Sequence, residues 1–140
     1  MIVLDTTVLS ELMRPQPAPA VLAWLDRQPA EDLFVTAIAV AEILYGIERL
    51  PPGQRREALG TAAGRILADA FAGRVLAFDE RAAVAYAAVV SAREQAGRPI
   101  GMADAQIAAI CRAHDVALAT RNTTDFALLD IALINPWQAT

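Results

Sequence analysis

Five short apolar runs alternate with longer helical patterns along this chain. Each run is continuously apolar, as expected for parallel strands that are buried on both faces. The alternation of strands and helices predicts an α/β fold with a central parallel sheet of four to five short strands, in which ligands bind beyond the carboxyl ends of the strands. The predicted strands are Ile2–Leu4, Leu33–Thr36, Val75–Phe78, Ala117–Thr120 and Ala132–Ile134.

Length and composition limit the class of protein. The chain has 140 residues, 56% of them hydrophobic, which predicts one domain over residues 1–140 with a substantial core. No apolar run approaches the roughly 18 residues that cross a bilayer, and no basic segment precedes the first apolar stretch, so we expect a soluble, cytoplasmic protein that does not bind membranes. The net charge of -4 argues against a protein that coats nucleic acid through its overall charge, although a local patch of arginines could still bind it.

Several chemistries are excluded by residue types that the chain lacks. All 12 positively charged side chains are arginines, so a Schiff base and a P-loop lysine are both impossible. The single cysteine, Cys111, rules out an internal disulfide, and the single histidine, His114, rules out a nuclease that uses two histidines. Carboxylates, hydroxyls, asparagines and arginines remain for chemistry.

Three carboxylates stand at positions that favour a functional site. Asp5 directly follows the first predicted strand, Glu42 interrupts the apolar face of a predicted helix, and Asp104 heads an apolar stripe in the first turn of a later one. Each residue also has a simpler interpretation. Asp5 can cap a helix, Glu42 can be exposed or paired with an arginine, and Asp104 can be a structural acid that the helix dipole favours.

The segment ATRNTTDF, residues 119–126, supplies a fourth element. Its apolar strand ends at Thr120, and Asn122 and Asp125 follow in a turn, where capping of a short helix is the simpler interpretation. An α/β sheet can bring these strand ends and helix starts together. Clustered acids repel one another and need a cation, and all-oxygen ligands select a hard ion such as Mg²⁺ or Mn²⁺, which supports phosphodiester hydrolysis.

Four stretches of the sequence, in their order along the chain, resemble segments of one protein family. They are MIVLDTTVLSEL, TAIAVAEILYGIERL, RPIGMADAQIAAICRAHDVALATRNTTDF and INPW. Through them the whole chain resembles the PIN-domain ribonucleases, specifically the VapC-type toxins of bacterial toxin–antitoxin pairs and their FitB-like relatives. The resemblance implies an α/β/α sandwich and an endoribonuclease that uses Mg²⁺, with Mn²⁺ as the alternative ion.

The resemblance also implies a role for each acidic residue. Asp5, Glu42 and Asp104 would form the acidic core, with Asp5 and Asp104 as direct metal ligands. Glu42 would orient the attacking water, act as its base or hold a second metal ion. Asn122 stands where many relatives have a fourth acid, and Asp125 is the nearby substitute, so the site has one negative charge fewer for a second ion.

Polar residues near these acids complete the expected site. Thr7 stands where family members often carry Asn or Ser, and Thr120 would orient a carboxylate through its hydroxyl. Arg121 is the candidate for binding flanking RNA phosphates, although surface solvation is the simpler interpretation of any single arginine. Asp79 also follows a predicted strand, but it lacks a partner feature and is interpreted as a helix cap.

The partners are likewise implied by the resemblance. RNA would be the substrate, and a small antitoxin encoded nearby would restrain the nuclease and alone contact DNA. Because relatives form two-fold dimers, we expect a homodimer. Amphipathic helices around Val21–Leu25 and Ile43–Leu50 are predicted to form an apolar groove for the antitoxin, with Trp24 and Tyr45 as anchors. The alternative function is a weakly catalytic or non-catalytic module that binds an antitoxin and strengthens its DNA binding.

Overall fold

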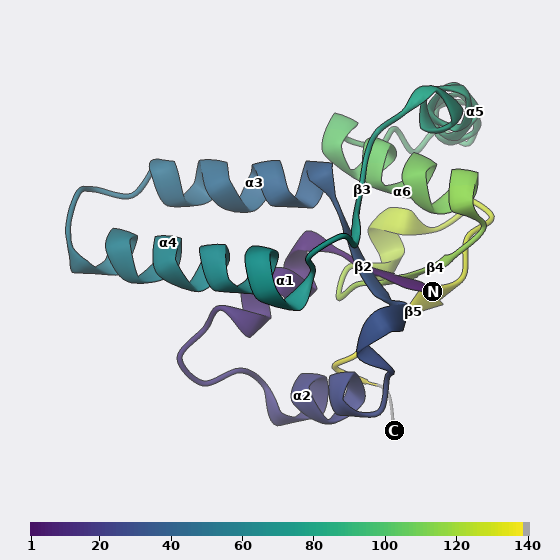
Figure 1. Cartoon of the computed structure of the whole chain (residues 1–140). Coiled ribbons are helices and arrows are strands. Elements are labelled where there is room, and N and C mark those ends of the chain that lie inside the picture. The colour runs from purple at the N-terminus through teal and green to yellow at the C-terminus, as the bar shows by residue number, and fades with distance from the viewer. Residues whose placement is uncertain (139–140) are drawn as a thin grey trace.

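The computed structural model describes residues 1–138 and contains a five-stranded sheet in which every neighbouring pair of strands is parallel (Figure 1). The strand order is β3-β2-β1-β4-β5. The strands are β1 (Ile2–Leu4), β2 (Leu33–Thr36), β3 (Val75–Leu76), β4 (Ala117–Ala119) and β5 (Leu133–Ile134). The predicted α/β fold with a parallel sheet is confirmed, and the last three strands are shorter than the sequence predicted.

Six α-helices and three shorter helical segments connect the strands in the described part of the chain. The α-helices are α1 (Thr6–Leu12), α2 (Pro19–Asp26), α3 (Ala37–Glu48), α4 (Gln54–Arg65), α5 (Glu80–Gln95) and α6 (Met102–His114). The shorter segments are the 3-10 helices η1 (Ala30–Asp32) and η3 (Thr123–Phe126) and the π-helical turn η2 (Ile66–Ala70). No helix among residues 1–138 has both the length and the apolar character that crossing a membrane requires.

Successive strand residues point to opposite faces of the sheet and so divide the core into two layers. Val3 and Leu118 pack among the buried residues of α5 and α6. Their chain neighbours Leu4 and Ala119 pack on the other face, with buried residues of α1 and α2. Helices therefore cover both faces of the sheet, as Figure 1 shows, and give the α/β/α arrangement of a PIN-like fold.

The helix starts follow ordinary capping chemistry in two places. The Thr36 hydroxyl accepts a hydrogen bond from the Ala39 N–H at 3.0 Å and caps α3. The Asp79 carboxylate accepts one from the Ala82 N–H at 3.0 Å and caps α5, which confirms the interpretation of Asp79 as a cap. The Asp79 side chain thus has a structural role as a cap, unlike Asp5, whose side chain makes no capping bond.

The strand order creates a switch point beside β1. The chain leaves β1 toward β2 on one side, whereas β4 lies on the other side and continues to β5. In open α/β sheets this arrangement leaves a crevice at the carboxyl ends of the two strands, where ligands bind. The residues that follow β1 and β4 are Asp5 and Thr120, so the fold places the first candidate carboxylate at this crevice.

Candidate functional site

Asp5 occupies the N-cap position of α1, but its side chain makes no capping hydrogen bond. The first turn is closed by the backbone carbonyl of Asp5, which accepts hydrogen bonds from the N–H groups of Val8 and Leu9 at 3.0 and 3.2 Å. The simpler interpretation of Asp5 as a helix cap was therefore wrong. The residue as a whole is 3% exposed, and another interaction must account for its burial.

Two threonine hydroxyls orient the Asp5 carboxylate. Thr120 donates to Asp5 Oδ2 at 2.7 Å, and Thr7 donates to the same oxygen at 3.2 Å. The described residues donate no hydrogen bond to Oδ1, and no buried side-chain oxygen in residues 1–138 lacks a partner. Oδ1 is therefore accessible to solvent, so one oxygen of Asp5 is fixed and the other is free to bind a ligand.

The same hydroxyls hold the segment that follows β4. The Arg121 N–H donates to the Thr7 hydroxyl at 3.3 Å, and the Asn122 N–H donates to the Thr120 hydroxyl at 3.0 Å. These bonds lock the backbone of residues 120–122 against the end of β1. The side chain of Asn122 makes no capping bond to η3 and is exposed, so it is free to face a ligand.

Asp104 lies in the first turn of α6 and is partly buried. Ile107, Ala108 and Cys111 on the same helical face are completely buried, as the apolar stripe predicted. The pKa of Asp104 is raised to about 6, mainly by burial and then, in decreasing order, by the negative charges of Asp5, Glu42 and Asp125, while the positive charge of Arg93 lowers it. The charges of three carboxylates from other parts of the chain thus reach Asp104 at this site.

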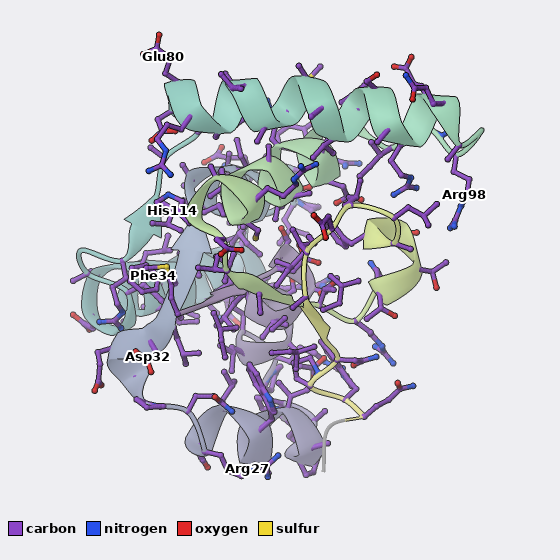
Figure 2. All side chains as sticks on the ribbon, turned by 90° about the vertical axis from the view of Figure 1, so that its right-hand side faces the viewer. Arg27, Asp32, Phe34, Glu80, Arg98 and His114 are labelled. Atoms are coloured by element: carbon purple, nitrogen blue, oxygen red, sulfur yellow. The ribbon has the colours of Figure 1, made fainter. Side chains whose placement is uncertain are left out.

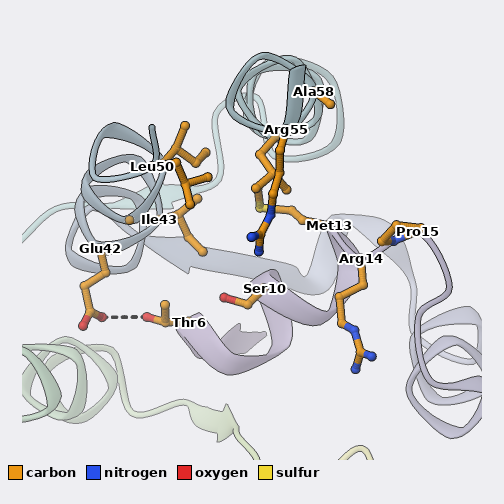
Figure 3. A pocket seen from close by; sticks show the side chains of 13 residues that line it. Thr6, Ser10, Met13, Arg14, Pro15, Glu42, Ile43, Leu50, Arg55 and Ala58 are labelled. Atoms are coloured by element: carbon orange, nitrogen blue, oxygen red, sulfur yellow. Dashed lines mark hydrogen bonds between the residues drawn. The ribbon is translucent and has the colours of Figure 1, made fainter. Parts of the chain in front are cut away.

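Glu42 is exposed, which is one of the two positions that its sequence neighbours left open. The reason is that α3 extends beyond the sheet, and Ala39 is its only buried residue. The Thr6 hydroxyl donates to Glu42 Oε1 at 2.7 Å and holds the carboxylate near the start of α1 (Figure 3). Sequence reasoning missed Thr6, although the threonine pair directly after Asp5 was a visible signal.

Asp125 and Arg121 are both exposed and flank the site on the segment after β4. Asp125 lies in η3, and its charge reaches Asp104 as described above. The Arg121 guanidinium stands over the ring of Trp137, 5.0 Å from its centroid, in a cation–π arrangement. The stacking gives Arg121 a preferred direction at the edge of the crevice.

The oxygen donors suit a hard divalent cation, but they do not form a ready-made cage. Within residues 1–138, no three Asp, Glu, His or Cys side chains are gathered closely enough to hold a metal ion together. Mg²⁺ usually binds one or two carboxylates and fills its remaining positions with water and substrate phosphates. The open Oδ1 of Asp5 and the carboxylate of Asp104 in the first turn of α6 have the donor chemistry for that kind of binding.

A groove of about 640 Å³ runs between α1, α3 and α4 and reaches the acidic site (Figure 3). Thr6 and Glu42 lie at one end, and Arg14 and Pro15 lie at the other. The apolar part of the lining consists of Met13, Ile43, Ile47, Leu50, Ala58 and Leu59. The floor and walls are therefore mostly apolar, and a carboxylate stands at one end.

The predicted contribution of α2 to such a groove was wrong. Val21 and Trp24 are 0% and 5% exposed and pack into the core under the sheet, so Trp24 cannot anchor a partner. The prediction for Ile43–Leu50 was closer, because residues of this part of α3 line the groove. Tyr45 is 65% exposed, with the guanidinium of Arg49 over its ring, and it does not line the groove.

The fold and its side chains define an α/β protein with an acidic site at the switch point of a parallel sheet. Comparison with known proteins extends this description. The chain matches the PIN domain family over residues 2–131. The chain belongs to the PIN-domain family, in the VapC-type group that includes toxin FitB.

Individual relatives match over nearly the full chain. The identity is 44% with VapC ribonuclease Y4jK of Sinorhizobium fredii, over 99% of both chains. The identity is 42% with toxin FitB of Neisseria gonorrhoeae, over 98% of this chain and 99% of that protein. A chain in the solved structure of FitAB bound to an IR36 DNA fragment has a TM-score of 0.92 and 41% identity, and the match covers 100% of this chain and 98% of that one.

Proposed function

We propose that this protein is a Mg²⁺-dependent endoribonuclease that acts as the toxin of a toxin–antitoxin pair. The observation that carries the proposal is that the charges of Asp5, Glu42 and Asp125, which come from separate parts of the chain, all reach the partly buried Asp104. Such a concentration of negative charge favours a cation. The identity with VapC ribonuclease Y4jK and with toxin FitB supports hydrolysis of RNA as the reaction.

Each acidic residue has a part in the proposed reaction. Asp5 and Asp104 hold the metal ion, with Asp5 presenting Oδ1 while Thr7 and Thr120 restrain Oδ2. Bound Mg²⁺ supplies charge neutralisation for the scissile phosphate and lowers the pKa of a coordinated water. Glu42, on α3 and hydrogen-bonded to Thr6, orients the attacking water or accepts its proton.

The segment after β4 contacts the substrate in this proposal. Asn122 offers an exposed amide on this segment, and the charge of Asp125 reaches Asp104 from the same segment. Arg121 binds a phosphate that flanks the cleaved bond, because its guanidinium is already directed by Trp137 and stands one residue from the Thr120–Asp5 hydrogen bond. Sequence preference for the RNA would come from the surface around the crevice.

Control by a second protein follows from the groove. We expect an antitoxin to lay an apolar helical face along α1, α3 and α4 and to direct an arginine at the acids beyond Glu42, because a guanidinium pairs well with carboxylates. The match to a chain of FitAB bound to DNA supports an assembly that reaches DNA through the partner. The free protein is expected to be a cytoplasmic homodimer.

Cleavage of RNA by the purified protein tests the proposed activity. Wild-type protein should cut end-labelled single-stranded RNA with Mg²⁺ and should lose this activity in EDTA. Asp104→Asn should be inactive, whereas Asp32→Asn, an exposed acid on η1, should be fully active. Cleavage that continues in EDTA, or an active Asp104→Asn variant, would contradict the assignment. If the wild-type protein is active, sequencing of RNA ends after its brief induction in cells would identify the target.

A weakly catalytic or non-catalytic module is the second candidate function. It is favoured by Asn122 at the position of a fourth acid, and by the lack of three gathered acids among residues 1–138. Such a module would bind its antitoxin and strengthen the antitoxin's hold on DNA. Folded protein that binds the partner tightly but shows no metal-dependent cleavage would favour this candidate.

A further inference from the structure

Arg93 is a buried arginine whose guanidinium binds backbone carbonyls. The residue is 5% exposed, although it lies in the last turn of α5. Its Nε donates to the Arg98 carbonyl at 2.7 Å, and its Nη1 donates to the Asp125 and Ala127 carbonyls at 2.7 and 3.3 Å. Two of these three carbonyls belong to η3 and the residue after it, so Arg93 ties the end of α5 to the segment that carries Asn122 and Asp125.

No carboxylate is paired with this cation in the part of the chain that the structure describes. Taking a guanidinium out of water costs free energy unless hydrogen bonds compensate, and the three carbonyls supply only part of this compensation. The positive charge of Arg93 acts on Asp104, which lies on the neighbouring helix α6. A methionine or leucine would fill the same apolar position at lower cost, so packing alone does not explain an arginine here.

Arg98 adds a second hydrogen bond to the same segment. Its Nη2 donates to the Thr124 carbonyl at 3.3 Å, and Figure 2 shows Arg98 just beyond the end of α5, beside the η3 turn. Buried Phe126 and Leu129 anchor the segment from its apolar side. The backbone of residues 124–127 is therefore held from two directions, and Arg93 is the contact that is both buried and charged.

We propose that Arg93 is a positioning residue for the acidic site. By binding the Asp125 and Ala127 carbonyls it ties η3 to the end of α5, which packs on α6, and so keeps Asn122 and Asp125 at the distance from Asp104 that the reaction needs. Its role in the reaction rests on the proposed ribonuclease function. Its role as a clamp on residues 121–129 does not, because that is a property of the folded chain alone.

Three variants separate this role from a merely structural one. Arg93→Met removes all three hydrogen bonds while keeping an apolar stem, and Arg93→Lys keeps the charge but lacks the planar fork that reaches carbonyls on two sides. Arg81→Met is the matched control, because Arg81 is an exposed arginine of the same helix whose Nη2 also donates to a backbone carbonyl, that of Ala113 at 2.7 Å. The readouts are amide hydrogen exchange of metal-free protein and the kcat and KM of RNA cleavage.

The proposal predicts faster exchange in residues 121–129 of Arg93→Met and a kcat about 10- to 100-fold lower with KM little changed, since small misplacements of catalytic groups have effects of this size. Arg93→Lys should recover part of both losses, and Arg81→Met should match wild type in both. If Arg93→Met does not fold, Arg93→Lys alone must show both effects.

Two results would overturn the proposal. One is unchanged exchange in residues 121–129, which would mean that Arg93 does not hold the segment. The other is increased exchange with wild-type kcat, which would reduce Arg93 to a structural contact. A wild-type protein that cleaves no RNA would instead contradict the proposed function. The hydrogen-exchange data would still test whether Arg93 holds residues 121–129.

Discussion

The hydroxyl of Thr120 donates a 2.7 Å hydrogen bond to Oδ2 of Asp5 and so joins the ends of β4 and β1, which are 115 positions apart in the chain. Both residues are almost completely buried. The bond exists because β4 lies directly beside β1, in a register that pairs Leu4 with Ala119. It fixes one carboxylate oxygen and leaves the other open, which is the arrangement that a metal ligand needs.

Removing the Thr120 hydroxyl should weaken both the fold and the site. Thr120→Val keeps the shape but leaves Asp5 Oδ2 and the Asn122 N–H without this partner, so the free energy of unfolding should fall by about 1–3 kcal/mol. Urea denaturation measures this change, and RNA cleavage should fall in parallel. Thr120→Ser is the matched control, because it retains the hydroxyl. Equal stability of the valine and serine variants would show that the hydrogen bond has no net effect.

The pKa of Asp104 makes stability depend on pH in a definite direction. Its folded-state pKa of about 6 lies above the ordinary value of 3.8, mainly because burial disfavours the charged form. The stability that the protonated form contributes is fully present below pH 3.8 and is lost as pH rises through about 6. In EDTA, Asp104→Asn should therefore gain about 1–2 kcal/mol over wild type at pH 8.

Thermal unfolding between pH 5 and 8 checks this dependence. The difference in Tm between Asp104→Asn and wild type should grow as pH rises, reaching several degrees at the upper end. Asp32→Asn should show no such growth, because Asp32 is exposed on η1, away from the carboxyl ends of the strands. A constant Tm difference across this range would argue that ionisation of Asp104 does not destabilise the metal-free protein.

Metal binding should stabilise the protein and should require the same two acids. A ligand that binds only the folded state adds RT ln(1 + [L]/Kd), or about 2.7 kcal/mol when Mg²⁺ is present at 100 times its Kd. The Tm of wild type should therefore rise with Mg²⁺ and return to its starting value with EDTA. Asp5→Asn and Asp104→Asn should not respond. A full response in either variant would remove that residue from the proposed ligand pair.

Much of this fold could be predicted from local sequence, and particular residues show why the rest could not. β1 and β2 have the predicted limits because Val3, Leu4 and Val35 are buried completely. The third strand ends at Leu76 instead of Phe78, because β3 lies at the edge of the sheet, where Val75 is 42% exposed. An edge strand is paired and buried on one side only, so its regular structure can end before the apolar run does. The length of the apolar run therefore overestimates the length of the strand.

The candidate site was less predictable, because its contacts depend on which strands and helices become neighbours. Nothing in the local sequence specifies that Thr120 meets Asp5 or that Thr6 meets Glu42. Trp24 was predicted to line a groove for a partner, but it packs in the core. An amphipathic sequence pattern identifies the apolar face of a helix but does not identify what packs against that face. Arg93 did leave a signal, since it extends the stripe of Ala82, Tyr86 and Val89 on α5, where a charged residue is unexpected.

The oligomeric state is the fourth prediction. Large apolar side chains are exposed on both helices of the α5–α6 layer, including Val84 at 74% and Met102 at 69%. If two copies bring their acidic sites to a shared groove, the interface must include the start of α6, where Met102 stands two residues before Asp104. Light scattering at micromolar concentration should give a dimer for wild type and Val84→Glu but a monomer for Met102→Glu. A monomeric wild type would contradict the homodimer.

The last prediction concerns control through the groove between α1, α3 and α4. Gly46 lines this groove on α3, and a Cβ atom added there would meet nothing within 4 Å. Gly60 on α4 has the same freedom but does not line the groove, which makes it a matched control. Both Gly46→Gln and Gly60→Gln should fold with a free energy of unfolding about 0.5–1 kcal/mol higher, because each replaces a helical glycine.

The two glutamine variants should differ only in their response to the partner. Expression of wild type or of either variant alone should arrest growth, and Asp5→Ala should relieve the arrest because the acidic site is lost. Co-expression of the adjacent small gene should rescue cells that carry wild type or Gly60→Gln. It should not rescue cells that carry Gly46→Gln, because the new side chain occupies the space for the partner's helix. Rescue of Gly46→Gln as complete as that of Gly60→Gln would place the antitoxin on another surface, and wild type that accumulates folded without harm would refute the toxin assignment itself.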